Sequence, residues 1–456
     1  MPTENANRST AFIWEETMKT MVELRPGRAG RTVAAALLAA SLLAGGSARA
    51  ADDVSGEITV WSWNVAAAAL QAVVPAFNKE YPNVKVTVQD LGNQPVYDRG
   101  LAGCAAGGTD LPDVYSVENG EAEVFWSRFP ECFTDLKAVG ADEAALLGKF
   151  PAFKLTELTV GDKVYAMPWD SGPAVVFYRR DLYEAAGVDP ATITTWDEFI
   201  EAGKKVLAKA GANAKFVSLN GDTSWFRMLA NQAGCAYFDD KGESITISQP
   251  GCVQALETIK KINDAGLFMN GNWDETLTAI KANALASAVY GGWYEGSVRG
   301  NAPDQSGKWG VYKLPAFEKG GNQTANIGGS ALAIPASSKN PKAALAFVNF
   351  ALGRPDSQIT QLKASGLVPT LPEAVNDPFV KEAQPFWGGQ KVWEVVLGTL
   401  PDIKPSRGTQ YFAEADSLVN AVYAEFLKGN GGTAQAALDQ AADQIASATG
   451  LPIAGK

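Results

Sequence analysis

The chain has 456 residues, of which 46% are hydrophobic and 20% charged, and its formal net charge is −11 at pH 7. This length exceeds what a single hydrophobic core usually serves, so we expect about two or three domains. The acidic balance gives little attraction for nucleic acid or for an anionic membrane surface, and we expect neither as a partner.

The first fifty residues have the pattern of a secretory signal peptide. Arg25, Arg28 and Arg31 precede the apolar run TVAAALLAASLLAG, and the small residues of ARA (48–50) predict cleavage after Ala50. Met21 is a natural start for this signal, so residues 1–20 are interpreted as an upstream extension. The apolar run is shorter than the roughly 20 residues that span a bilayer, and no cysteine near Ala50 could carry a lipid anchor. We expect the mature protein to be free in the periplasm.

After the signal, strand-like runs alternate with helical patterns. ITVWSW (58–63) is followed by an Ala-rich helical stretch that ends near Tyr81, and VKVTVQDL (84–91) and DVYSV (113–117) are the next strand-like runs. Alternation of this kind predicts parallel α/β layers. The sequence has no internal repeat and no long Gly/Ser/Pro linker, so any passage between domains is short.

Two helices have clear start and stop signals. Thr195 and Glu198 form a capping box, and Gly211 ends the helix that follows it. Asn340 and Pro341 begin another helix, which ends before Gly353.

The cysteines are Cys104, Cys132, Cys235 and Cys252. In an oxidising compartment an even number of cysteines favours disulfides over metal ligands. Of the possible connectivities we favour the neighbours in sequence, Cys104 with Cys132 and Cys235 with Cys252. The absence of a C-x-x-C motif argues against a redox role.

The chain contains no histidine, which excludes His-based catalytic triads and H-E-x-x-H zinc sites. It also has no G-x-S-x-G motif and no P-loop. We therefore expect no metal site and no cofactor.

Aromatic, amide and carboxylate side chains follow the ends of several predicted strands. In open α/β sheets ligands bind beyond the carboxyl ends of the strands, so these side chains could converge on one cleft. The combination suits a sugar, because sugar C–H faces stack on flat rings while hydroxyls pair with polar groups. The candidates are Trp61, Trp63, Asn64, Glu118, Asn119, Trp169, Asp170, Asp222, Trp225, Trp293, Tyr294 and Glu295.

Each candidate also has a purely structural interpretation. Trp61 and Trp63 alternate on one strand, so one of them can face the core, and Asp222 can simply cap a helix. Trp293 is favoured for ligand contact, because the glycines of YGGWYEG (290–296) remove side chains that would block access to its ring.

Taken in order along the chain, several segments resemble the family 1 extracellular solute-binding proteins of carbohydrate ABC importers, the group that includes maltose-binding protein. The match covers nearly all of the mature chain. The segments are ITVWSW, VVPAFNKEYPNVKVTV, LPDVYSVENG, VYAMPWDSGPAVVFYRRDLYEAAGVDP, TTWDEFIEAGKKV, SAVYGGWYEG, WGVYKLPAF, NIGGSALAIPASSKNPKAALAFVNFAL and PSRGTQYF.

This resemblance implies an α/β, two-lobed periplasmic-binding-protein fold of type II, with a ligand cleft between the lobes and a hinge that the chain crosses three times. It implies that lobe I comprises residues 51–168 and 322–366, and that lobe II comprises residues 169–321 and 367–456.

The resemblance also implies roles for individual residues. By position, Trp293 corresponds to the family's stacking aromatic residue and Tyr411 to a further stacking ring. Asp222 and Trp225 fall where the family has a ligand carboxylate and a nearby aromatic ring. Gly329 and Arg407, in the segments NIGGS and PSRGTQYF, complete the implied set.

One departure from the family pattern concerns PWDSG (168–172). In maltose binders the ligand carboxylate lies about two positions after Asp170, where this chain has Gly172. The resemblance therefore does not extend to maltodextrin specificity.

The expected function is that of a monomeric periplasmic binding protein, not an enzyme. It would capture a neutral mono-, di- or oligosaccharide between its lobes and deliver it to the permease subunits of an ABC transporter. The alternatives are a binding protein for a polyol, an amino sugar or a glycerol phosphate, and a secreted glycoside hydrolase that uses paired Asp/Glu residues.

Overall fold

The structure is a computed structural model that describes residues 54–142, 146–151, 154–155, 158–404 and 409–455. The predicted signal peptide (1–50) and Arg407 lie outside the described residues.

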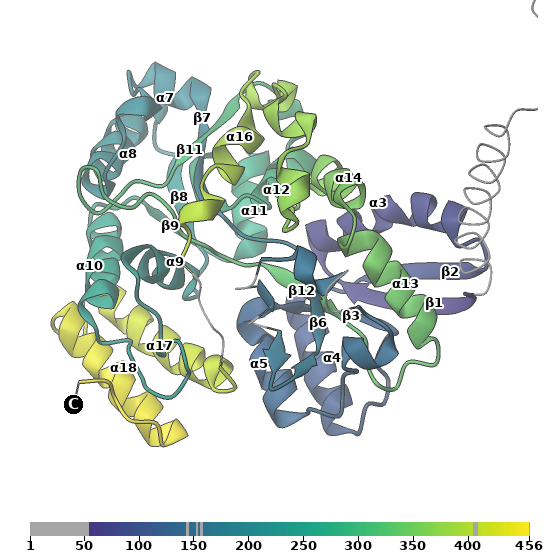
Figure 1. Ribbon diagram of the computed structural model, residues 1–456. Helices are drawn as coiled ribbons and strands as arrows, with labels where there is room; N and C mark the ends of the chain where they lie inside the picture. Colours follow the sequence, from purple (N-terminus) through teal and green to yellow (C-terminus); the bar gives the residue numbers. More distant parts are fainter. Residues whose placement is uncertain (1–53, 143–145, 152–153, 156–157, 405–408, 456) are drawn as a thin grey trace, which may run out of the picture. The chain divides into compact units, whose positions relative to one another are not determined.

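Two five-stranded sheets organise the described chain (Figure 1). In the first sheet β1 pairs in parallel with β2 and β3, whereas β12 runs antiparallel to β3 and β6. The strands, in sheet order, are β2 (Val84–Asp90), β1 (Gly56–Ser62), β3 (Val114–Glu118), β12 (Ser330–Ala333) and β6 (Ala166–Pro168). A separate two-stranded sheet consists of β4 (Thr159–Val160) and β5 (Lys163–Val164).

Helices that follow or precede these strands pack around the first sheet. They are α3 (Asn64–Glu80), α4 (Asn93–Ala105), α5 (Asn119–Arg128), α13 (Pro341–Leu352) and α14 (Pro355–Ser365). Along β1 the apolar side chains of Ile58 and Val60 are buried, whereas Glu57, which precedes Ile58, is exposed to solvent. This alternation is the period-2 pattern of a strand with one covered face.

In the second sheet β10 pairs in parallel with β8 and antiparallel with β7, and β7 also pairs antiparallel with β11. The strands, in sheet order, are β11 (Trp309–Lys313), β7 (Ala174–Arg179), β10 (Leu285–Gly291), β8 (Lys215–Leu219) and β9 (Phe268–Asn270). All residues of β7 and β10 are buried. Both strands are nearly continuous apolar runs, as expected for central strands covered on both faces.

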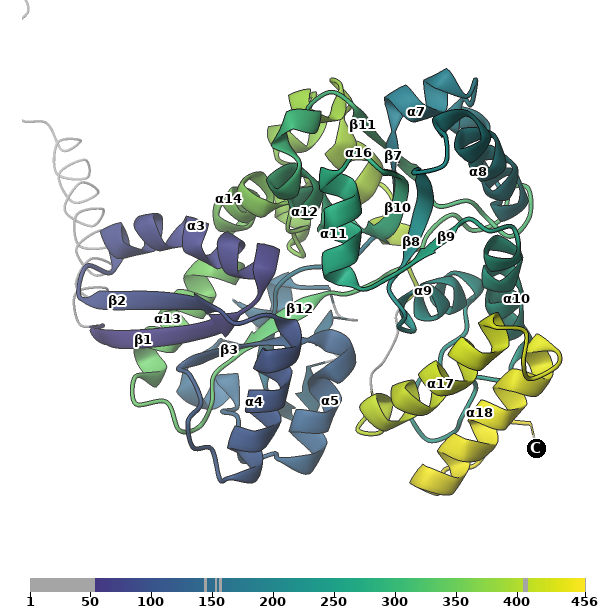
Figure 2. The ribbon, with the colours of Figure 1, turned by 180° about the vertical axis from the view of Figure 1, so that it is seen from behind.

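The helices of the second sheet come from two separate parts of the chain. They are α7 (Arg180–Ala185), α8 (Trp196–Ala210), α9 (Ser224–Ala233), α10 (Pro250–Asp264), α11 (Trp273–Lys281), α12 (Tyr294–Asn301), α16 (Val392–Leu397), α17 (Phe412–Leu427) and α18 (Ala434–Thr449). The short α15 (Pro372–Val375) lies against α14. The C-terminal helices α17 and α18 lie beside α10 (Figure 1 and Figure 2). Among the described residues, no helix has the length and apolar character needed to cross a membrane.

The chain passes between the two sheets in three crossing segments, residues 169–173, 324–329 and 366–371, which lie against one another. Ser171 N donates to the Val368 carbonyl (3.2 Å), and Gly172 N donates to Asn326 Oδ1 (2.9 Å). These bonds join the three segments side by side at the boundary between the sheets.

The predicted helix boundaries are confirmed. Thr195 Oγ1 accepts from Glu198 N (3.3 Å) and Glu198 Oε2 accepts from Thr195 N (2.9 Å), which is the reciprocal capping box at the start of α8. Gly211 follows α8 with φ 90°, a conformation that favours glycine. The predicted helix after Asn340 is α13, which ends before Gly353.

Both predicted disulfides are also confirmed. Cys104 in α4 is bonded to Cys132, and Cys235 is bonded to Cys252 in α10. The sequence separations are 28 and 17 residues, so each bond ties a helix to a nearby loop.

Replacing Cys235 and Cys252 together by alanine should lower the free energy of unfolding by about 3 kcal/mol, because the disulfide restricts the unfolded chain. Urea denaturation of the oxidised proteins measures this difference. The difference in the free energy of unfolding between wild type and variant should vanish when both proteins are fully reduced. An unchanged midpoint in the oxidised variant would contradict the expectation.

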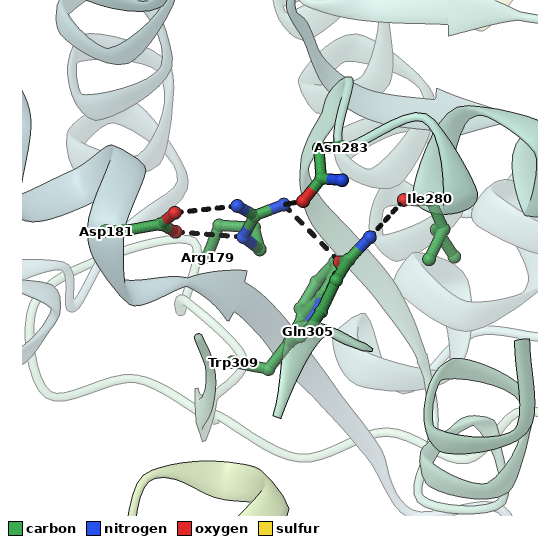
Figure 3. Close-up of polar contacts among 6 residues, drawn as sticks. All are labelled: Arg179, Asp181, Ile280, Asn283, Gln305 and Trp309. Atoms are coloured by element: carbon green, nitrogen blue, oxygen red, sulfur yellow. Dashed lines mark hydrogen bonds and ion pairs between the residues drawn. The ribbon is translucent and has the colours of Figure 1, made fainter. Parts of the chain in front are cut away.

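A buried arginine fixes the end of β7 and the start of α7 (Figure 3). Arg179 is 3% exposed, and its guanidinium pairs with both carboxylate oxygens of Asp181 at 2.8 and 2.6 Å. It also donates to Asn283 Oδ1 at 3.0 Å and to Gln305 Oε1 at 3.4 Å. Two parallel bonds to one carboxylate require the planar guanidinium, so lysine could not replace it.

Gln305 extends this network toward the sheet. Its Nε2 donates to the Ile280 carbonyl (2.6 Å), and its Oε1 accepts from Trp309 Nε1 (2.8 Å) (Figure 3). Arg179 therefore connects β7 with β11 and with the turn before β10.

Arg179→Ala should lower the free energy of unfolding by about 3 kcal/mol, because it breaks a buried ion pair. This value is near the lower end for such pairs, since the Asp181 side chain is 44% exposed. Urea denaturation measures the loss. Lys204→Ala is the matched control, since Lys204 and Glu201 form an exposed i,i+3 pair. The control should change stability by less than about 0.5 kcal/mol. Equal effects of the two variants would show that the Arg179 network contributes no special stability.

Candidate functional site

The carboxyl ends of β1, β2 and β3 meet at one edge of the first sheet, because these strands are parallel. The amino end of β12 lies at the same edge, since Ser330 pairs with Glu118. This edge borders a cavity of about 550 Å³ whose other side comes from the second sheet. The lining includes Trp63, Asn64, Gly92, Asn93, Gln94, Glu118, Asp170, Asn272, Trp273, Asp274, Trp293, Ser297, Gly328, Gly329 and Ser330.

Indole rings line the cavity on both sides. Trp273 and Trp293, from the second sheet, are half-buried and lie 6.1 Å apart with 39° between their planes. Behind them the buried Tyr290 and Tyr294 stack at 4.3 Å, and Trp293 Nε1 donates to the Ile327 carbonyl (3.0 Å). Packing therefore holds the Trp293 ring at the cavity wall. Trp63, at the start of α3, contributes a ring from the first sheet.

The polar lining is acidic. Among the described lining residues, the charged ones are Glu118, Asp170 and Asp274. Asn93 Nδ2 donates to Glu118 Oε2 at 3.4 Å, and burial raises the pKa of Glu118. Carboxylates accept hydrogen bonds from hydroxyl or ammonium donors and repel anions, so this lining suits a neutral or cationic ligand.

Asp170 is the most deeply placed of these carboxylates. It is 3% exposed and accepts from Ser330 N at 2.7 Å. Burial raises the pKa of Asp170 to about 6, and the nearby Glu118 carboxylate adds to this, although the Lys154 ammonium and the bonds from Ser330 oppose it.

A smaller cavity of about 110 Å³ adjoins the larger one, since both are lined by Glu118 and Gly328. Its lining includes Asn119, Arg227, Tyr237 and Phe412. The Arg227 guanidinium lies 5.4 Å from the Phe412 ring and 3.7 Å from the Asp416 carboxylate. The smaller cavity thus contains a cation whose charge is already partly compensated.

The structure brings part of the predicted set together. The residues at the larger cavity are Trp63, Asn64, Glu118, Asp170, Trp293 and Gly329, and Asn119 lines the smaller cavity beside Glu118.

The remaining described candidates do not line either cavity, and each side chain has a different use. Trp169 is 1% exposed and donates to Gln361 Oε1 (2.6 Å); Trp225 is 2% exposed and donates to the Ser218 carbonyl (3.0 Å). Trp61 is half-buried against the core of the first sheet, under the guanidinium of Arg99.

Tyr294 and Glu295 are also engaged inside the protein. Tyr294 is fully buried against Tyr290, and Glu295 pairs with Arg299 (2.9 Å) and accepts from Trp387 Nε1 (2.9 Å).

Asp222 and Tyr411 complete this group. Asp222 is exposed and accepts from Ser224 N (2.9 Å), the first residue of α9, from the position before the N-cap residue Thr223. Tyr411 packs against the core of the second sheet, and its neighbour Phe412 reaches the smaller cavity instead.

The glycines beside Trp293 have a different role from the predicted one. A Cβ atom on Gly291 would collide with the Trp293 indole, and one on Gly292 would lie 2.5 Å from Val396 Cγ1. Side chains at these positions would strike protein atoms. The glycines therefore permit close packing behind the ring, and the prediction that they clear a path for ligand is wrong.

Gly172 is explained in the same way. A Cβ at this position would overlap the Ile327 carbonyl oxygen, which accepts from Trp293 Nε1. Ile327 N also donates to the Gly172 carbonyl (2.8 Å). The close contact of two crossing segments requires glycine here, so a ligand carboxylate cannot occupy this position.

The cavity residues that sequence reasoning missed include Asn93, Gln94, Asn272, Trp273, Asp274, Ser297 and Ser330. Trp273 follows β9, which has only three residues and gave no recognisable strand pattern. The capping box of Asn272 and Glu275 marks the start of α11 and was the available signal.

Residues 61–357 match the family described as bacterial extracellular solute-binding protein. A lactose-binding protein of Rhizobium radiobacter is 30% identical over 426 residues, covering 91% of this chain and 98% of the relative. An arabinooligosaccharide-binding protein of Bacillus subtilis (strain 168) is 29% identical over 427 residues, covering 90% and 96%.

Solved structures show the same fold. An ABC transporter associated binding protein from B. animalis subsp. lactis Bl-04, in complex with β-1,6-galactobiose, has a TM-score of 0.75 at 23% identity, covering 86% of this chain and 97% of that one. Maltose-bound MalE3 of T. maritima has a TM-score of 0.71 at 24% identity, covering 86% and 99%. These similarities confirm the expected two-lobed α/β fold.

The raised pKa of Asp170 predicts a specific pH dependence. An unfolded aspartate titrates near pH 3.9, so the folded state binds this proton more tightly. The contribution of protonated Asp170 to the free energy of unfolding is complete below about pH 4 and is lost as the pH rises through about 6. The free energy of unfolding changes by on the order of 3 kcal/mol over this range.

Asp170→Asn should remove this part of the pH dependence. Urea denaturation between pH 4 and pH 8 measures it as a changing difference between wild type and variant. Asp162→Asn, in the exposed turn between β4 and β5, is the matched control and should follow the wild-type profile. Parallel profiles for wild type and Asp170→Asn would contradict the assignment.

Proposed function

Since the chain belongs to the bacterial extracellular solute-binding protein family, we propose that it captures a neutral carbohydrate in the larger cavity and delivers it to the permease subunits of an ABC importer. The observation that carries this proposal is the pairing of indole rings with acidic hydrogen-bond acceptors around one cavity, with Trp63 on one side and Trp273 and Trp293 on the other.

The physical basis is the two-sided character of a sugar ring. Its C–H faces bury apolar surface against an indole, and its hydroxyls donate to acceptors such as Glu118, Asp170 and Asp274. Relatives named for lactose and for arabinooligosaccharides support a disaccharide or short oligosaccharide as the ligand class. The cavity volume, about 550 Å³, lies within the range of small-molecule sites.

Binding would be coupled to lobe closure. A sugar that contacts both sheets has a higher affinity for the closed arrangement than for an open one, and this difference shifts the population. The crossing segments are the only stretches of the described chain that join the two sheets, so they would carry the change in backbone angles. The closed form would be the one that the permease recognises.

Other ligand classes are less well supported. A glycerol phosphate would place its dianion beside Glu118, Asp170 and Asp274, and each carboxylate opposes that charge. The family and the relatives named above are binding proteins rather than enzymes, and we propose that this protein also leaves its sugar unchanged.

Family membership implies that the protein is exported. We further propose cleavage after Ala50, absence of a lipid anchor, a monomeric state and no role in nucleic-acid binding. We keep the lobe assignment as part of the proposal, with lobe I from residues 51–168 and 322–366 and lobe II from residues 169–321 and 367–456.

The proposal predicts a thermal shift of the mature protein, residues 51–456, with neutral sugars. Lactose and arabinobiose represent the favoured class, mannitol represents polyols, and glycerol 3-phosphate represents anions. A sugar at 100 times its dissociation constant should add about 2.7 kcal/mol to the free energy of unfolding. Chromatography should recover the sugar unchanged. A shift with glycerol 3-phosphate alone, or conversion of the sugar, would overturn the proposal.

Trp273→Ala and Trp293→Ala should each weaken sugar binding by roughly 1 to 3 kcal/mol through lost burial and stacking. Isothermal titration calorimetry measures the change. Trp61→Ala is the matched control, because this half-buried indole lies on β1 without lining the cavity. The control should bind with wild-type affinity. Equal losses in all three variants would point to a general structural effect.

A further inference from the structure

We propose that Asp90 is a positioning residue for the larger cavity, acting through the backbone of two lining loops without touching ligand. The two loops are residues 63–64, where β1 leads into the first turn of α3, and residues 92–94, where β2 leads into the first turn of α4. This inference rests on the proposed function and names a residue on which the shape of that site depends.

The geometry begins with one carboxylate oxygen at the end of β2. Asp90 Oδ1 accepts from Asn64 N at 3.0 Å and from Gly92 N at 3.2 Å. Asn64 and Gly92 both line the cavity, whereas Asp90 lies outside the lining and is exposed. A single atom therefore joins the two loops that form much of the first sheet's side of the cavity.

The first of these bonds supports an unfavourable backbone conformation. Asn64 has φ 42°, in the left-handed region that residues with side chains seldom adopt. It is also the first residue of α3, and the preceding Trp63 provides no side-chain cap. Asp90 supplies from the neighbouring strand the acceptor that this helix start lacks, and its negative charge suits the positive end of the helix.

The conformation of Asn64 sets how the chain enters α3 directly after Trp63. Trp63 is extended, with φ −143° and ψ 145°, and the chain turns into α3 immediately after it. If Asn64 relaxed toward an ordinary conformation, the Trp63 ring would be free to turn away from the rings of Trp273 and Trp293.

The second bond acts on the other loop of the first sheet, at Gly92. Gly92 has φ 82°, and the following Asn93 donates to Glu118 Oε2 at 3.4 Å. By holding Gly92, the Asp90 carboxylate fixes the backbone next to Asn93, and Asn93 in turn orients Glu118. Glu118 is a hydrogen-bond acceptor that lines both cavities. One aspartate supports an aromatic contact and a polar contact at the same time.

The test compares Asp90→Ala with Asp90→Asn and with a matched control. Asp90→Asn keeps an oxygen that can accept both N–H groups. Asp113→Ala is the control. Asp113 Oδ2 also accepts a hydrogen bond from a backbone N–H of β1, that of Thr59 (3.0 Å). Asp113 directly precedes β3, so it lies at the amino end of that strand, away from the edge that borders the cavity. Affinity for lactose and arabinobiose is measured by calorimetry, and stability by thermal unfolding.

Asp90→Ala should weaken binding about ten-fold, the order expected when hydrogen bonds to a charged acceptor are lost. Asp90→Asn should restore binding to within about two-fold of wild type. Asp113→Ala should lower stability and leave affinity unchanged. Unchanged affinity in Asp90→Ala, or equal losses in Asp90→Ala and Asp113→Ala, would overturn the inference.

A second measurement needs no ligand and separates this inference from the proposed function. In hydrogen exchange, Asp90→Ala should speed exchange of the Asn64 and Gly92 amides, whereas Asp113→Ala should not. If wild type binds neither sugar but exchange changes in this way, the proposed ligand is wrong and the positioning role stands. Unchanged exchange rates at both amides would contradict the positioning role. If Asp90→Ala does not fold, Asp90→Ser, which has a shorter side-chain acceptor, replaces it. Failure of both variants to fold would also contradict a role limited to positioning.

Discussion

Parallel pairing of β1 with β2 and β3 is the constraint on which the site depends. It brings the chain after Ser62, after Asp90 and after Glu118 to one edge of the first sheet, although these residues are well separated in sequence. Once these ends are adjacent, their side chains must be arranged around a common space. Trp63, Asn93 and Glu118 form that arrangement, and the hydrogen bond from Asn93 to Glu118 links two of them directly.

The second sheet supplies the facing wall through close packing. Trp293 is held by a bond to the Ile327 carbonyl, and that carbonyl leaves no room for a side chain at Gly172 or Gly291. The same backbone atom therefore orients an aromatic ring and brings two crossing segments into contact. Rigid placement of the ring and close approach of the crossing segments have one cause.

Much of the fold could be predicted because its signals are local. The capping box of Thr195, the start of α13 at Pro341 and the pairing of neighbouring cysteines all depend on residues close in sequence. The site was only partly predictable because its signals are not local. Trp169 and Trp293 both follow a buried strand, yet Trp169 is buried with its indole on Gln361, a partner 192 residues away. No pattern around Trp169 reveals that partner, and the short β9 concealed Trp273.

The place of β12 has a consequence for how the molecule is made. β12 lies between β3 and β6 in the first sheet, although the whole second sheet precedes it in the chain. The part of the protein that begins first is therefore completed last. A chain that ended before Ser330 would leave β3 and β6 with unpaired edges, and exposed strand edges favour aggregation. Folding of the first sheet must wait for long-range contacts, which are slow to form.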